Sequence, residues 1–117
     1  MVRKRPESID AYCVFNAVEV LSAIEDVKRF NSPLDLEKRD EVKEAIRELE
    51  ETIEDLIKCE KEAWVSRHAL RYDVDEIRRC LLEDSNVKRA KILLWDIEEK
   101  VTQILKDMGR RNLLIRW

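Results

Sequence analysis

The chain has 117 residues, of which 44% are hydrophobic and 42% charged, and 23 Lys and Arg against 26 Asp and Glu leave a net charge of −3. This length suits one domain with its own core, residues 1–117, and the near balance of charge excludes a chain-wide attraction to nucleic acid or anionic membranes. No apolar run reaches the roughly 20 residues that a membrane-spanning helix needs, so we expect no membrane contact.

The three cysteines lie among apolar residues of predicted helices, and none belongs to a Cys-x-x-Cys pair. We interpret Cys13, Cys59 and Cys80 as small buried hydrophobic residues in a reducing compartment, which predicts a cytoplasmic protein. Gln103 is the single glutamine among many Glu, Lys and Arg, a composition typical of heat-adapted proteins.

The first predicted helix spans about 8–30 and follows a basic lead, residues 1–7. Glu19 is the one charged residue within 11–24, so we expect a helix that is largely buried in the core. Asn16 is a polar exception in this apolar segment. A partly exposed Asn16 is the favoured interpretation, and a buried one that fixes the register between helices is the alternative.

The next predicted helix spans about 33–83, because after Pro33 this range has no Gly or Pro. A break near 72–73 is the alternative, since Asp73 and Glu76 have the spacing of a capping box. A row of apolar residues at intervals of seven keeps to one side of the helix, as in coiled coils and helical bundles. This row consists of Val42, Leu49, Leu56, Ala63 and Leu70.

A second apolar row lies beside the first and widens the buried face, so that two neighbouring helices are needed to cover it. It consists of Ile46, Ile53, Ile57 and Trp64. The flanking helices, about 8–30 and 85–108, are each close to half the length of the central helix and would cover it on one side. The uncovered row therefore predicts a homodimer with antiparallel central helices.

The last predicted helix spans about 85–108, with Gly109 as the residue that ends it. Ile92 and Trp95 fall outside its apolar stripe. Each is therefore covered by another element or available to a partner protein.

Residues 110–117 form a basic and apolar tail. Its large side chains are too apolar to remain in water, so the tail either folds back on the core or docks on another protein. These side chains are Leu113, Leu114, Ile115 and Trp117.

Glu50, Glu51 and Glu54 are candidates for metal binding. Their Glu-Glu-x-x-Glu spacing resembles the first half of a pattern in helical nucleotide pyrophosphohydrolases, where carboxylates hold magnesium. The second half of that pattern, Glu-x-x-Asp on a following helix, does not occur after Glu54. We therefore interpret the three residues as a solvated face, and we identify no catalytic, cofactor-binding or metal-ligating residue.

Basic residues near both ends and in the middle of the chain are the candidates for nucleic-acid contact. No helix-turn-helix or other reader motif accompanies them, and solvated arginine with a packed aliphatic stem is the usual alternative. These residues are Arg3, Lys4, Arg5, Arg67, Arg71, Arg78, Arg79, Arg110 and Arg111.

The sequence thus predicts an all-α antiparallel helical bundle and carries no family signature. As function we expect a non-enzymatic, self-associating interaction or scaffold module. The alternative is a small helical subunit that contacts nucleic acid within a larger complex. The expected interface residues are Ile46, Ile53, Ile57, Trp64, Ile92, Trp95, Leu113, Leu114 and Trp117.

Overall fold

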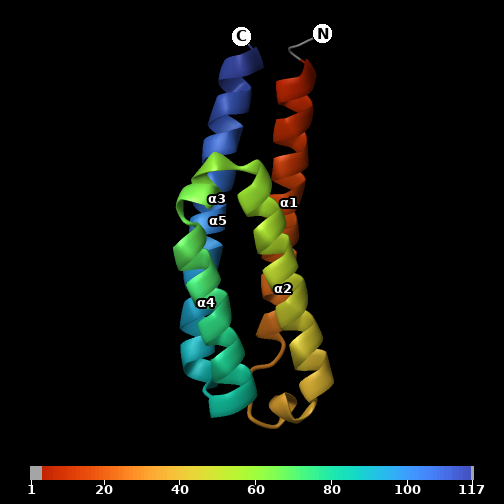
Figure 1. The fold of residues 1–117 in the computed structure, drawn as a ribbon, viewed down its shortest axis with the longest axis vertical. Helices are drawn as coiled ribbons and strands as arrows, with labels where there is room; N and C mark the ends of the chain where they lie inside the picture. The colour runs from red at the N-terminus through yellow and green to blue at the C-terminus, as the bar shows by residue number, and fades with distance from the viewer. Residues whose placement is uncertain (1–3, 117) are drawn as a thin grey trace.

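The computed structural model describes the backbone of residues 4–116 and the side chains of residues 11–110. Its principal dimensions are 53 × 21 × 20 Å. Successive long helices run in opposite directions along the longest axis (Figure 1), which confirms the predicted all-α antiparallel bundle. The long helices are α1 (Lys4–Lys28), α2 (Arg39–Cys59), α4 (Arg67–Arg79) and α5 (Val87–Arg116).

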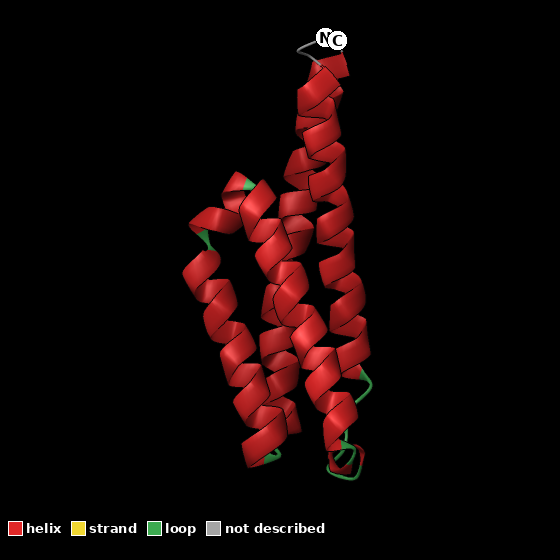
Figure 2. Ribbon diagram, turned by 45° about the vertical axis from the view of Figure 1, so that its right-hand side comes forward, coloured by secondary structure: helices red, strands yellow, loops and turns green. Residues whose placement is uncertain are grey.

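The long helices form a ring in which α1 packs against α2 and α5, and α4 packs against the same two helices. Three short elements lie in the connections: η1 (Asp35–Glu37), α3 (Lys61–Val65) and the π-helical turn η2 (Cys80–Asp84). The start of α1 and the end of α5 extend together past α3 at the end of the bundle that holds both termini (Figure 2).

The chain reverses direction between α2 and α4, so the prediction of one continuous helix over 33–83 is wrong. Glu60 is extended, with φ −120° and ψ 122°, and its carboxylate accepts a hydrogen bond of 2.9 Å from the N–H of Glu62. Ser66, with φ −92° and ψ 11°, separates α3 from α4. The alternative break near 72–73 is also wrong, because α4 passes through these residues without interruption.

The apolar row at intervals of seven is buried on both sides of this reversal. All five of its members are 0% exposed: Val42, Leu49, Leu56, Ala63 and Leu70. α2 and α4 run in opposite directions, and both pack against the same core. The seven-residue spacing of buried residues therefore continues through the turn unchanged. The spacing therefore identifies the buried faces without revealing the reversal.

Ser32 and Pro33 lie in a short turn, and α2 starts later than predicted, at Arg39. Asp35 Oδ2 accepts hydrogen bonds from Ser32 Oγ at 3.0 Å and from the N–H of Asn31 at 3.3 Å. These local bonds compete with a regular helix, as polar side chains do at turns.

Both terminal helices are longer than predicted. The first helix begins at Lys4 instead of residue 8, and the last continues to Arg116 instead of ending at 108. Asn86 caps the start of α5, because its Oδ1 accepts a hydrogen bond of 3.1 Å from the N–H of Arg89.

Asn16 is buried, with 5% of its surface exposed, so the favoured expectation of a partly exposed residue is wrong. Its Nδ2 donates to Cys59 Sγ at 3.5 Å, and Cys13 Sγ donates to the carbonyl oxygen of Cys59 at 2.9 Å. A slip of α1 along α2 would leave this buried amide without its partner. The contact therefore favours one register between the two helices.

Gly109 lies inside α5. Among the described residues, no atom other than those of its adjacent residues and of the surrounding helix backbone lies within 4 Å of the place where a Cβ would be. We expect Gly109→Ala to raise the free energy of unfolding by about 0.5–1 kcal/mol, because alanine loses less backbone entropy in a helix. Urea denaturation of both proteins measures this difference. A loss of stability would contradict a helix through this position and would indicate a left-handed glycine that ends it.

Candidate interaction surface

Three of the predicted interface residues are buried inside their own chain. Ile46, Ile53 and Ile57 are 1%, 1% and 4% exposed. Their prediction as an interface with a second copy is wrong, because the reversal of the chain lays α4 over this side of α2. The side chain of Ile53, for example, lies with Val74 of α4 in the recess between the two helices.

Other predicted site residues lie outside the residues whose side chains are described. Among the interface candidates these are Leu113, Leu114 and Trp117, and among the basic candidates Arg3, Lys4, Arg5 and Arg111. The backbone of α5 is helical as far as Arg116.

Trp64 on α3 is 52% exposed, but a neighbour from its own chain covers one face of its ring. The guanidinium carbon of Arg67 lies 3.6 Å from the ring centroid, and Arg67 Nη1 donates to the carbonyl oxygen of Trp64 at 2.8 Å. This cation–π pair stabilises the short α3 turn and occupies part of the surface that Trp64 could offer to a partner.

Ile92 and Trp95 form the exposed apolar surface of α5, with 67% and 59% of their areas accessible. They are three residues apart and therefore neighbours on the helix surface. Lys88 and Lys91 precede them by four residues, and both lysines are exposed. The outer face of α5 thus combines two large apolar side chains with two positive charges.

The outer face of α1 carries a second exposed apolar strip. Tyr12, Phe15 and Val18 are 59%, 58% and 50% exposed. The sequence places them beside the buried stripe of a helix that is apolar over most of its circumference. Their spacing of three residues indicates from the sequence that they share one face of the helix. Only the positions of α2 and α5 in the structure show that this face of α1 remains uncovered.

The two halves of the chain differ in the sign of their charge. Residues 11–60 contain 14 Asp and Glu against 7 Lys and Arg, whereas residues 61–117 contain 10 against 13. Carboxylates of α1 and α2 gather along a shallow recess between these helices, of about 260 Å³. Those that line it are Glu19, Asp26, Glu48, Glu51 and Asp55.

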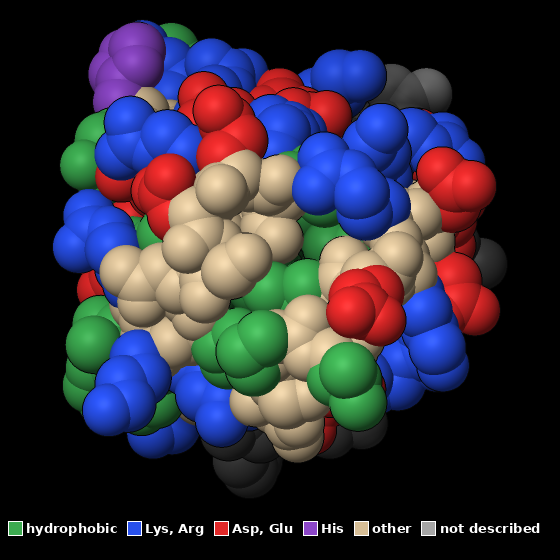
Figure 3. All heavy atoms as spheres, turned by 90° about the horizontal axis from the view of Figure 1, so that it is seen from below, with side chains coloured by type: hydrophobic (Ala, Val, Ile, Leu, Met, Phe, Trp, Pro, Cys, Tyr) green, Lys and Arg blue, Asp and Glu red, His purple; other side chains and the backbone are tan. Residues whose placement is uncertain are grey.

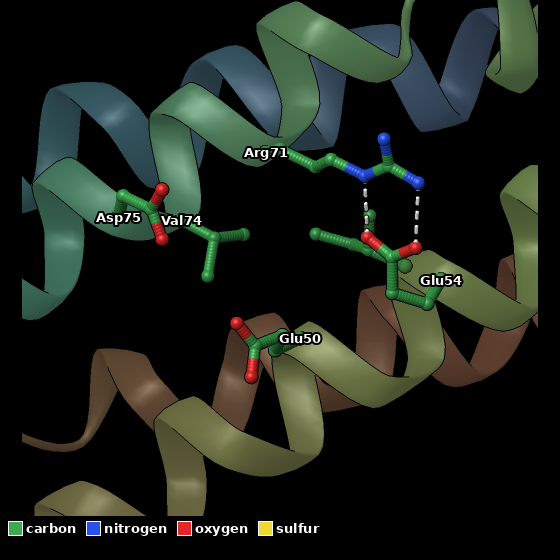
Figure 4. A pocket seen from close by; sticks show the side chains of 6 residues that line it. Glu50, Glu54, Arg71, Val74 and Asp75 are labelled. Atoms are coloured by element: carbon green, nitrogen blue, oxygen red, sulfur yellow. Dashed lines mark hydrogen bonds and ion pairs between the residues drawn. The ribbon is translucent and has the colours of Figure 1, made fainter.

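Glu50 and Glu54 line a recess of about 140 Å³ between α2 and α4 (Figure 4). Glu54 accepts two hydrogen bonds of 2.8 Å from Arg71, which hold the pKa of its carboxyl below the usual value. Glu50 forms an ion pair of 3.1 Å with Arg78. Within the described side chains, no three His, Cys, Asp or Glu residues are grouped closely enough to hold a metal ion.

Most described arginines of the predicted nucleic-acid surface are already engaged within the chain. Besides the two pairs in that recess, Arg79 bonds Glu76 at 2.5 Å, and Arg110 bonds Asp107 at 3.2 Å. The end of the bundle opposite the termini shows acidic and basic side chains interspersed (Figure 3). The fold therefore does not gather these arginines into one unpaired basic face.

Comparison of the chain with protein families, with curated proteins and with solved structures finds no match. Within the described helices, none combines the length and the apolar character needed to cross a bilayer.

Two isoleucines, one in the core and one on the surface, distinguish burial within the chain from burial between copies. We expect Ile53→Ala to lower the free energy of unfolding by about 2–5 kcal/mol, independently of protein concentration. The matched change Ile92→Ala should alter it by less than about 0.5 kcal/mol under conditions where the protein is monomeric. A cost for Ile53→Ala that depends on protein concentration in urea denaturation would restore the isoleucine row as an interface.

Proposed function

We propose that this chain is a non-enzymatic, self-associating helical interaction module that uses the outer faces of α1 and α5. The observation that carries the proposal is the exposed pair Ile92 and Trp95, at 67% and 59%. Full burial of a large apolar side chain contributes roughly 1.5–3 kcal/mol, so an exposed pair on one helix face favours association.

Charge complementarity supports a second copy of the chain as the partner. The apolar pair on α5 adjoins Lys88 and Lys91, whereas the apolar strip on α1 adjoins the carboxylates Glu19 and Asp26. Because α1 and α5 are neighbours in the bundle, one contact between two copies can include α1 of each copy and α5 of the other. The two helix faces in this contact carry opposite charges and exposed apolar side chains, which favours their association.

Sedimentation velocity over a range of protein concentrations tests this arrangement. We expect a dimer that dissociates as salt is raised, because its exposed charge pairs are screened. Lys88→Glu combined with Lys91→Glu should weaken the dimer at least tenfold, and adding Glu19→Lys with Asp26→Lys should restore much of the affinity.

The control for these variants is Lys43→Glu with Lys58→Glu, which makes the same change of charge at exposed positions of α2 outside the surface. This control should dimerise like the unchanged protein. A protein that stays monomeric up to its solubility limit would overturn self-association, and equal effects of both double reversals would overturn the proposed surface.

Contact with nucleic acid is the second proposal, and it has less support because its described arginines are mostly ion-paired. Binding of labelled DNA or RNA that falls steeply with salt would favour it over self-association. A cytoplasmic location is likewise part of the proposal, since it depends on the three thiols of the sequence.

A further inference from the structure

Asp73 on α4 is a buried acid that faces α5. Only 6% of its surface is exposed, and its Oδ2 accepts no hydrogen bond from any donor in the described part of the chain. The neighbouring acid is Asp96 on α5, and contact with Asp96 adds to burial in raising the pKa of Asp73. Two adjacent carboxylates cannot both be ionised in a buried position without a large electrostatic cost, whereas a proton between them removes the repulsion.

The groups around this pair favour one shared proton. Lys100, one turn after Asp96 on α5, donates a hydrogen bond to Asp96 Oδ2. Glu76 on α4 is the neighbouring buried acid, and it is bonded to Arg89 of α5 at 3.4 Å. No cation among the described residues is bonded to Asp73, so the positive charge of Lys100 acts mainly on Asp96.

The other elements packed against α4 contribute no further charge to Asp73. From α2, Glu50 and Glu54 point into the recess between α2 and α4 (Figure 4), and they form ion pairs with Arg78 and Arg71. From α3, Lys61 and Glu62 are exposed at the surface. The charges that act on Asp73 therefore come from α5.

We propose that Asp73 and Asp96 form a proton-dependent latch between α4 and α5. In the closed latch, the O–H of Asp73 donates to the carboxylate of Asp96. When this proton leaves to solvent, two carboxylates face each other across the helix contact, and α4 loosens from α5. Irregular backbone at Ser66 and at the π-helical turn Cys80–Asp84 bounds α4 at both ends, so it can shift as one unit.

The direction of the pH dependence follows from the two carboxyl groups. Burial, followed by the contact with Asp96, raises the pKa of Asp73 from 3.8 to about 7. Asp73 therefore stabilises the fold fully below its unfolded pKa of 3.8, and this contribution is lost as pH rises through 7. Contacts with Asp73 and Lys100 lower the pKa of Asp96, whose contribution is lost as pH falls through that lowered value. The latch is tightest at mildly acidic pH.

Hydrogen exchange of the full chain between about pH 5 and pH 9, corrected for the intrinsic pH dependence of exchange, tests the latch. In the unchanged protein we expect the protection of α4 to fall at least tenfold as pH rises from 5 to 7 and to level off above pH 7. Asp73→Asn should keep its protection across this range, because an amide still donates to Asp96 and cannot ionise. The control Asp55→Asn removes an exposed carboxylate of α2 and should respond like the unchanged protein.

A carboxyl titration of the unchanged protein by ¹³C NMR gives a second measurement that needs no variant. One aspartate carboxyl should titrate near neutral pH. If every aspartate titrates below about pH 5, or if Asp73→Asn and the unchanged protein lose protection in parallel, the latch is overturned. Neither result bears on self-association, which uses the outer faces of α1 and α5.

Discussion

The burial of one apolar row holds this bundle together. The row continues from α2 into α4, although these two helices run in opposite directions. Leu49 and Leu56 on α2 and Leu70 and Ile77 on α4 are all 0% exposed, although the chain reverses between them. The reversal brings α4 over the second row of α2, so a surface that an extended helix would leave exposed is covered within one chain. Any association of copies must consequently use another surface.

Two buried polar contacts fix the register between neighbouring helices of this apolar core. Asn16 donates a hydrogen bond to Cys59 between α1 and α2, and Asp73 neighbours Asp96 between α4 and α5. Apolar contacts tolerate small shifts of one helix along another, whereas a buried polar group that loses its partner is strongly destabilising. One such contact therefore lies in each half of the bundle, and the second also depends on a proton.

Part of the charged surface connects neighbouring helices. Arg71 and Arg78 bond carboxylates of α2 from α4, which leaves few unpaired bases for an external partner. Exposed ion pairs of this kind contribute little to stability, but they shield the edges of the core between the helices. Ile92 and Trp95 on α5 lack such cover from the described residues and leave a large apolar surface exposed.

The sequence by itself determined the helical class and the faces that are buried, because an apolar spacing near 3.6 residues can satisfy only a helix. Only the tertiary structure decided the reversal at 60–66. Glu60 breaks the helix there, although this segment contains no Gly or Pro from which the break could be predicted. It also decided that Asn16 is buried and Phe15 exposed. Periodicity shows which residues share a face, whereas the path of the chain determines which faces another helix covers.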